Sequence, residues 1–106
     1  MLNKEVRFIM LALLFGIPGV AIAGTCAQSN NKVGFVGLDS AGGAIYVDVS
    51  EHSNQCGCNY VRFYPENSDT DKVLSILLAA RLTEKRVRID INDSNSCNSG
   101  YRVYIQ

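Results

Sequence analysis

Residues 68–91, SDTDKVLSILLAARLTEKRVRIDI, decide the fold because they predict a helix, a tight turn and a returning strand. Ser68 can cap the unpaired N–H groups of the first helical turn, and Asp69 and Asp71 place negative charge near the positive end of the helix dipole. The apolar residues that follow cover more than a narrow stripe, so we expect other protein to cover most of the helix. The run is too short to cross a membrane, which needs about 20 apolar residues.

The strand after the turn, residues 86–91, alternates strictly between polar and apolar side chains. Such alternation is typical of a strand with one buried face, so the whole stretch predicts a core helix packed on a sheet. A helix lying in a membrane surface is the alternative. It is disfavoured because Lys72, Ser75 and Arg81 do not form a basic face.

Residues 1–23 have the pattern of a secretory signal peptide. Lys4 and Arg7 give a basic start, an apolar segment follows at 8–15, and an A-x-A sequence predicts cleavage after Ala23. A retained membrane anchor is the competing interpretation. Cleavage would leave residues 24–106 as one domain, secreted or periplasmic, with no membrane insertion.

Charge and size limit what this domain does. Residues 24–106 carry eight Lys/Arg and nine Asp/Glu, a formal charge of −1. No basic field exists to hold a phosphate backbone, so nucleic acid is not an expected partner. A domain of this size has a marginal core, and secreted proteins of that size gain stability from disulfides or oligomerisation.

All four cysteines, Cys26, Cys56, Cys58 and Cys97, follow the predicted cleavage site. An even number in a short secreted chain predicts two disulfides, with three possible pairings. A bridge between Cys56 and Cys58 would be strained, so each should pair with Cys26 or Cys97. A zinc site is the alternative, but the spacing is not that of a zinc finger. We therefore predict a disulfide-stabilised domain without a metal or other cofactor.

The rest of the domain is predicted to form short strands joined by polar loops. Residues 24–32 are polar and predicted to be irregular. Strands are predicted at 33–38, 44–50, 60–64, 86–91 and 101–105. Their inward residues include Ile45, Val47, Val49, Val61, Phe63, Val87, Ile89, Ile91, Val103 and Ile105.

The element order β-β-β-α-β-β predicts a mainly β fold with one helix, a five-stranded Greek-key barrel of the OB type. In that barrel the helix closes one end, and the third and fifth strands run side by side and parallel. Cys58 and Cys97 precede those two strands, which favours Cys58–Cys97 together with Cys26–Cys56. An α+β sandwich of the same elements is the alternative.

No catalytic arrangement stands out, and we predict that the protein is not an enzyme. His52 is the only histidine and lies in a polar, cysteine-tied loop, where an exposed bystander is the expected role. A small hydrolase would have to use His52 or acidic residues such as Asp90 and Asp93. Asp39 has an ordinary role in a turn.

Outward side chains of the third and fifth strands are the best candidates for binding. They are Tyr60, Arg62, Tyr64, Arg102 and Tyr104. Tyrosine offers a flat apolar ring with a hydroxyl, and arginine can grip a carboxylate such as that of sialic acid. We expect an aromatic and cationic surface on adjacent strands; ordinary cross-strand packing is the alternative.

The signal peptide, the early Cys26, the short strands and the segment 74–89 followed by Cys97 resemble one known group. The chain resembles small secreted proteins related to the B subunit of subtilase cytotoxin, which are similar to pertussis-like toxin B subunits. This resemblance implies an OB-fold barrel, a ring of five copies, a toxin A subunit as partner and binding of cell-surface glycans. It carries over no individual sugar-contacting residue.

These observations together predict a secreted, non-catalytic binding module that recognises glycans on a cell surface. A periplasmic inhibitor or other protein-interaction module without glycan binding is the alternative.

Overall fold

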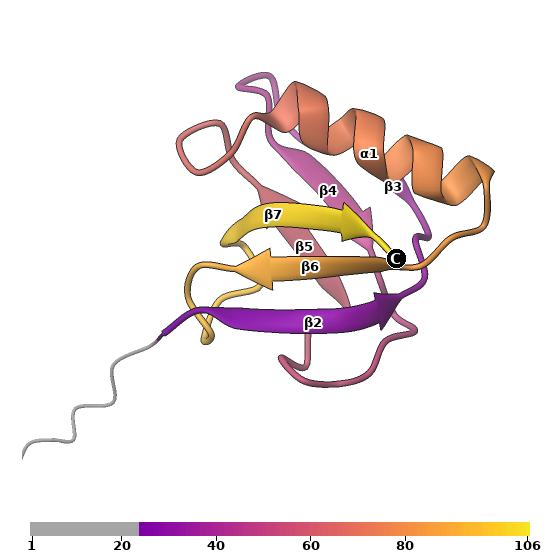
Figure 1. Ribbon diagram of the computed structural model, residues 1–106. Helices are drawn as coiled ribbons and strands as arrows, with labels where there is room; N and C mark the ends of the chain where they lie inside the picture. The colour runs from indigo at the N-terminus through magenta and orange to yellow at the C-terminus, as the bar shows by residue number, and fades with distance from the viewer. Residues whose placement is uncertain (1–23) are drawn as a thin grey trace, which may run out of the picture.

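The computed structural model describes residues 24–106, so the predicted signal peptide, residues 1–23, lies outside the described residues. The described chain is mainly β with one helix (Figure 1). The elements are β2 (Cys26–Asn31), β3 (Val36–Leu38), β4 (Ile45–Asp48), β5 (Tyr60–Phe63), α1 (Thr70–Leu82), β6 (Val87–Ile91) and β7 (Gly100–Ile105). Within residues 24–106, no helix has the length and apolar character that a membrane crossing requires.

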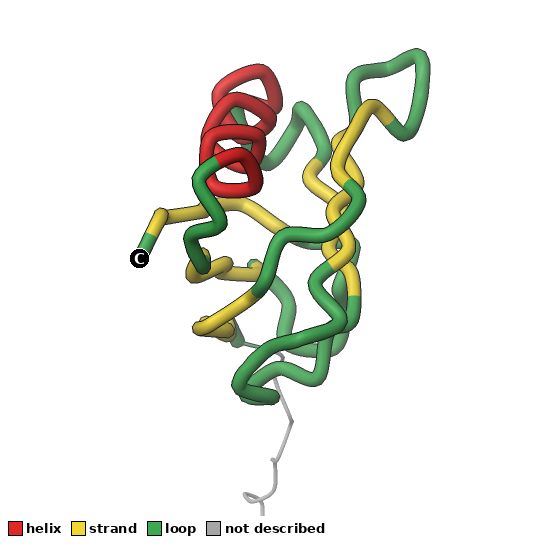
Figure 2. The backbone as a smooth tube through the Cα atoms, turned by 90° about the vertical axis from the view of Figure 1, so that its right-hand side faces the viewer, coloured by secondary structure: helices red, strands yellow, loops and turns green. Residues whose placement is uncertain are grey.

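The six strands form one mixed sheet in the order β2-β6-β7-β5-β4-β3. Neighbours are antiparallel except β5 and β7, which pair in parallel at Phe63 and Gly100. The predicted parallel pairing of these two strands is therefore confirmed. The sheet curls, so that β2, β6 and β7 form a front layer and β3, β4 and β5 a back layer (Figures 1 and 2).

The prediction of a closed, five-stranded barrel is not confirmed, because the sheet has six strands and is not closed. The additional strand is β2, which forms where an irregular segment was predicted. Its amide side chains Gln28 and Asn31 are 2% and 0% exposed and bond to the backbone of Cys58 and Val87. These hydrogen bonds let a polar segment point inward, so β2 lacks the apolar alternation by which strands are recognised.

β2 and β3 lie at opposite edges of the sheet although only residues 32–35 separate them. This connection runs beside the end of β4. The Lys32 N–H donates to the Glu51 carbonyl at 2.9 Å, and the Gly34 N–H donates to the Asp48 carbonyl at 2.8 Å. The predicted strand 33–38 is thus a bent connection followed by the three-residue β3.

The predicted helix is present, but it begins one residue later than a Ser68 cap requires. Asp69 is the N-cap, and its carboxylate accepts a hydrogen bond from the Lys72 N–H at 3.3 Å. The Ser68 hydroxyl instead donates to the Tyr101 carbonyl at 3.1 Å. The predicted Ser68 cap is wrong because a tertiary contact with β7 engages that hydroxyl, while the neighbouring carboxylate serves the helix.

Only one face of α1 is buried. The buried residues are Thr70, Val73, Leu77 and Ala80. Leu78 is 40% exposed and Leu82 is 82% exposed, so the expectation that other protein covers most of the helix is wrong. A single sheet can cover one stripe of a helix, and the described chain has no second layer to cover the other side.

The core lies between the two layers of the curled sheet, with α1 across one end (Figure 2). The predicted inward residues that are buried are Ile45, Val47, Val49, Val61, Phe63, Val87, Ile89, Ile91 and Val103. Ile105 is 44% exposed because it lies at the end of the last strand. Two disulfides join Cys26 to Cys56 and Cys58 to Cys97, which is the favoured pairing.

β7 begins with a bulge that directs its side chains. Ile91 pairs with Gly100 and Asp90 with Arg102, so Tyr101 is an extra residue on β7. Gly100 faces inward, and a Cβ there would lie 2.6 Å from Val61 Cγ1 and 2.8 Å from Phe63 Cε2. Only glycine fits this position without moving the core.

Gly100→Ala is expected to lower the free energy of unfolding by about 1–3 kcal/mol, because the added methyl overpacks the core. Urea unfolding monitored by circular dichroism measures this. Gly37→Ala is the matched control, since a Cβ at Gly37 meets nothing within 4 Å. The interpretation fails if the two variants are equally stable.

Candidate functional site

The five residues predicted as one binding surface fall into two clusters in the structure. The Tyr60 cluster comprises Asp39, Tyr46, Tyr60, Arg62 and Asn98. The Asp90 cluster comprises Arg88, Asp90, Tyr101, Arg102 and Tyr104. The predicted residue Tyr64 is half-buried after β5 and belongs to neither.

The two clusters lie on different sides of the molecule. The Tyr60 cluster is on the outer side of β4 and β5, whereas the Asp90 cluster is on the outer side of β6 and β7. These strand pairs enclose the core between them, so their outer sides face opposite directions (Figures 1 and 2). The structure therefore does not bring the five residues together, and their role in binding stays a prediction.

In the Tyr60 cluster, two tyrosine rings stack and an arginine lies beside both. The centroids of Tyr46 and Tyr60 are 5.5 Å apart with an angle of 11° between the rings. The Arg62 guanidinium carbon is 5.1 Å from each ring centroid. Arg62 Nε donates to Asp39 Oδ2 at 2.8 Å, and Nη1 donates to Asn98 Oδ1 at 3.0 Å. The hydrogen bond to Asp39 raises the pKa of Arg62, which therefore stays charged.

In the Asp90 cluster, one carboxylate joins two arginines from neighbouring strands. Arg88 Nε lies 2.9 Å from Asp90 Oδ1, and Arg102 Nη2 lies 2.8 Å from Asp90 Oδ2. Strand register places Arg88 opposite Tyr104 and Asp90 opposite Arg102. The two guanidinium carbons lie 5.6 Å and 5.8 Å from the centroid of the Tyr104 ring, within the range of a cation–π interaction.

Asp90 stays ionised although its side chain is only 3% exposed. Burial alone raises the pKa of its carboxyl group. Hydrogen bonds from Arg88 and Arg102 act in the opposite direction, and the net result is a pKa below the ordinary value. The charged carboxylate therefore holds both arginines in place at neutral pH.

A lowered pKa in the folded state makes Asp90 a source of stability above the pKa of the unfolded chain, lost as pH falls through the folded pKa. Asp90→Asn is expected to lower the free energy of unfolding at pH 7 by about 1–3 kcal/mol. This deficit should shrink as the pH falls below the ordinary aspartate pKa of about 4, because wild-type Asp90 then becomes protonated.

Urea unfolding at pH 7, 4 and 2.5 measures this convergence. Glu66→Gln, at an exposed position before α1, is the control and should remain within about 0.5 kcal/mol of wild type at each pH. A deficit for Asp90→Asn that stays constant across the three pH values would contradict the role given to the carboxylate.

The arginines of both clusters are already engaged by the protein. Arg88 and Arg102 direct N–H groups at Asp90, and Arg62 directs its own at Asp39 and Asn98. None of the three guanidinium groups is therefore free for a bidentate hydrogen bond to a ligand carboxylate. What remains available is the Tyr104 ring, which is 46% exposed and has two fixed guanidinium groups beside it.

The residues considered for catalysis serve local structure. His52 Nδ1 accepts from the Asn54 N–H at 2.7 Å, and His52 Nε2 lies 3.1 Å from Asn59 Oδ1. Asp93 Oδ1 accepts from the Asn95 N–H within its own loop. Within residues 24–106, no group of three or more His, Cys, Asp or Glu side chains is placed to hold a metal ion.

Sequence reasoning missed the residues that connect each cluster. Strand alternation puts Tyr46, Arg88 and Asp90 on the outward faces of their strands, but their partners follow only from strand register. A usable signal was the Arg88-x-Asp90 spacing, which puts opposite charges on one face of a strand.

Comparison of the chain with protein families, curated proteins and solved structures found no match. The resemblance to the subtilase cytotoxin B subunit therefore depends on the residues quoted for it and stays a prediction.

Proposed function

We propose that this chain is a secreted or periplasmic, non-catalytic binding module of the OB type that recognises glycans through the Asp90 cluster. The OB assignment is supported by the parallel pairing of β5 and β7 and by the position of α1 between β5 and β6. β2 and β3 then correspond to two halves of one bent first strand, since only residues 32–35 separate them. Two disulfides in a short chain are typical of an oxidising compartment and support export.

The observation that carries glycan binding is the half-exposed Tyr104 ring, which has the guanidinium groups of Arg88 and Arg102 beside it. Asp90 fixes both arginines, so little side-chain entropy is lost when a ligand stacks on the ring. A sugar ring has an apolar face that suits an aromatic ring and hydroxyl groups that suit nearby donors. Because the arginine forks are engaged by Asp90, the arrangement favours neutral sugars over sialic acid.

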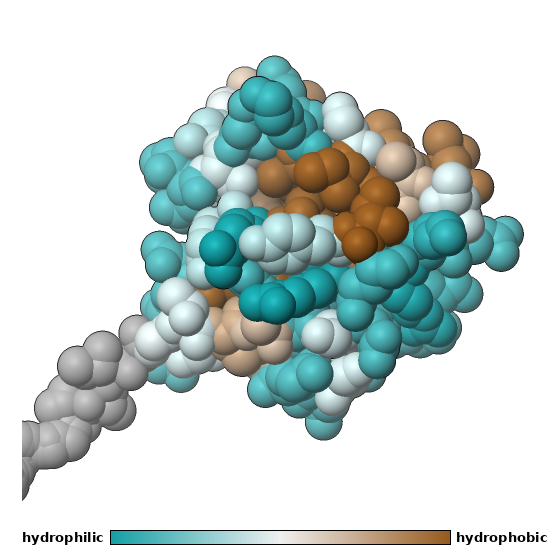
Figure 3. Space-filling view, in the orientation of Figure 1, coloured by the Kyte–Doolittle hydropathy of each residue, from teal (hydrophilic) through white to brown (hydrophobic). Residues whose placement is uncertain are grey.

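The surroundings of the cluster are amphipathic. Figure 3 shows polar surface over β6 and β7 and apolar surface between β7 and α1. Exposed aliphatic side chains at these elements are Leu78 and Leu82 on α1 and Ile105 on β7, which are 40%, 82% and 44% exposed. A polar platform beside an apolar strip fits an extended carbohydrate, which alternates apolar ring faces with hydroxyl edges.

A glycan array probed with residues 24–106 tests this proposal, followed by calorimetric titration with the best soluble sugar. Tyr104→Ala is expected to weaken binding about tenfold, which corresponds to about 1.4 kcal/mol. Tyr104→Phe keeps the ring and should retain most of the affinity. Phe35→Ala removes a 78% exposed ring elsewhere and is the matched control. Absence of binding to every sugar class would contradict the proposal.

A second candidate function, protein interaction, is favoured by apolar side chains around the edge strand β3. Phe35 is 78% exposed and Leu38 is 69% exposed. An edge strand with exposed apolar side chains is suited to pairing with another chain. The ring of five copies and the toxin A subunit, which the resemblance implies together with glycan binding, would also need a protein-contact surface such as β3.

Light scattering on the purified domain tests the second candidate. A mass five times that of one chain, reduced to the monomer by Phe35→Asp, would support assembly through β3. A monomer at all concentrations, together with no protein captured from periplasmic extract, would count against it.

A further inference from the structure

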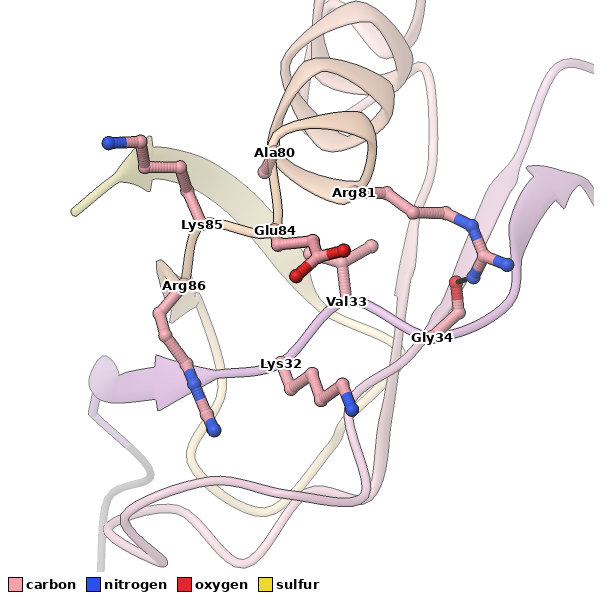
Figure 4. Close-up of a pocket in the computed structure, with 8 residues that line it drawn as sticks. All are labelled: Lys32, Val33, Gly34, Ala80, Arg81, Glu84, Lys85 and Arg86. Atoms are coloured by element: carbon pink, nitrogen blue, oxygen red, sulfur yellow. Dashed lines mark hydrogen bonds between the residues drawn. The ribbon is translucent and has the colours of Figure 1, made fainter.

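Half of the positive charge in residues 24–106 lines a single hollow. Four of the eight Lys and Arg side chains, Lys32, Arg81, Lys85 and Arg86, surround a cavity of about 640 Å³ where α1 ends (Figure 4). The remaining lining residues are Val33, Gly34, Ala80 and Glu84. The hollow is separate from the Asp90 cluster, with which it shares no residue.

The cations outside the hollow are closely paired. Each has a carboxylate at 2.8–2.9 Å, in the pairs Arg62–Asp39, Lys72–Asp69, Arg88–Asp90 and Arg102–Asp90. Inside the hollow, Lys32 and Arg86 share only Glu51, at 3.8 Å and 3.6 Å. Arg81 and Lys85 have no carboxylate within 4 Å among residues 24–106.

The lining therefore carries surplus positive charge. Its four cations and one carboxylate, Glu84, give a formal charge of +3, and counting the neighbouring Glu51 and Asp48, whose carboxylate lies against Gly34, leaves +1. The whole of residues 24–106 carries −1. Positive charge concentrated in a concave surface with a low-dielectric wall attracts anions more strongly than the same charge on a flat surface.

The frame of the hollow is fixed. Val33 and Ala80, 6% and 0% exposed, belong to the core beneath it. Arg81 Nη1 donates to the Gly34 carbonyl, which ties the end of α1 to the connection between β2 and β3. The cations thus come from three segments: Arg81 from the end of α1, Lys32 from that connection, and Lys85 and Arg86 from the residues before β6.

Glu84 is the one carboxylate among the residues that line the hollow. In Figure 4 its carboxylate lies among the lining side chains, near Val33, with Lys32 and Arg86 below and Arg81 to one side. Its backbone is in the left-handed region at φ 54°, a position after a helix end that favours glycine or asparagine. The chain thus holds a carboxylate among these cations, although it forms no ion pair within 4 Å with any cation of residues 24–106 and its backbone conformation is unfavourable.

We propose that this hollow binds a sulfate or phosphate ester group, which displaces the Glu84 carboxylate. A tetrahedral oxyanion offers oxygens in several directions, which matches cations arriving from three segments of the chain. The cavity is much larger than one such group, so it has room for the molecule that carries it. This inference does not depend on glycan binding at Tyr104.

The test uses residues 24–106 labelled with ¹⁵N and titrated with inorganic sulfate and phosphate against sodium chloride at equal ionic strength. Saturable shifts of the amides at 32–34 and 81–86, absent with chloride, are expected. Lys32→Gln with Lys85→Gln should weaken binding about tenfold or more, and neither lysine side chain fixes the fold. Lys72→Gln, paired with Asp69 at the other end of α1, is the control and should leave affinity unchanged.

Glu84→Asn provides an independent readout, since asparagine tolerates the left-handed backbone and removes the competing charge. It should tighten binding about threefold or more. Equal shifts with chloride, equal weakening by Lys72→Gln, or loss of binding in Tyr104→Ala would each overturn the proposal. A sulfated disaccharide and phosphatidylglycerol vesicles then identify the molecule that carries the ester group. Tighter binding of either probe than of the inorganic ion supports the site. If neither binds more tightly, the proposal that the hollow accommodates a carrier molecule is wrong.

Discussion

Gln28→Leu is expected to lower the free energy of unfolding by about 2–4 kcal/mol, although leucine is the more hydrophobic residue. The Gln28 side chain is 2% exposed. Its Nε2 donates to the Cys58 carbonyl at 2.9 Å, and its Oε1 accepts from the Cys58 N–H at 3.0 Å. Leucine would leave both backbone groups of Cys58 buried without partners, and each such group costs about 1–3 kcal/mol.

Guanidinium chloride unfolding at pH 7 measures this loss. Gln55→Leu is the matched control, because Gln55 is exposed and its only role shown is to accept a bond from the Ser29 N–H. Water can replace that partner, so the control should stay within about 0.5 kcal/mol of wild type. A Gln28→Leu protein as stable as the control would show that the buried amide network is dispensable.

Removing the Cys58–Cys97 disulfide is expected to cost about 2–5 kcal/mol. The bridge joins residues 39 positions apart and ties the loop before β7 to the residues before β5. Cys58 is 1% exposed and belongs to the core, so the double alanine variant loses core packing as well as the cross-link.

The second disulfide provides the comparison. Cys26–Cys56 spans 30 positions, so the chain-entropy contribution is nearly the same, but both of its cysteines are only partly buried. The Cys26→Ala/Cys56→Ala variant should therefore lose less stability than the Cys58→Ala/Cys97→Ala variant in non-reducing unfolding experiments. The opposite order would contradict the structural role assigned to Cys58.

Several elements were predictable because their signals are local. Alternation at Val87, Ile89 and Ile91 identified a strand with a buried face, and the apolar run before it identified the helix. The order of elements then led to parallel β5 and β7, and from there to the pairing of Cys58 with Cys97. The helix and strand followed from the chain's own periodicity, whereas the pairings followed from the geometry of the OB-type barrel that the element order suggested.

Other features were out of reach because they depend on contacts between distant segments. The Gln28 side chain can point inward from β2 because the backbone of Cys58 supplies its hydrogen bonds. Asp69, not Ser68, caps the helix, because the Ser68 hydroxyl donates its hydrogen bond to the Tyr101 carbonyl. No local pattern records such partners.

The candidate site divides in the same way. Sequence alone identified Tyr60, Arg62, Arg102 and Tyr104 as outward residues, since alternation determines the face of each strand. Only the curl of the sheet decided that they form two clusters on opposite sides. The pattern of side chains along the sequence therefore determined the elements and the buried face of each. The tertiary structure alone decided which charges meet, because strand register and sheet curvature arise from packing the entire chain around one core.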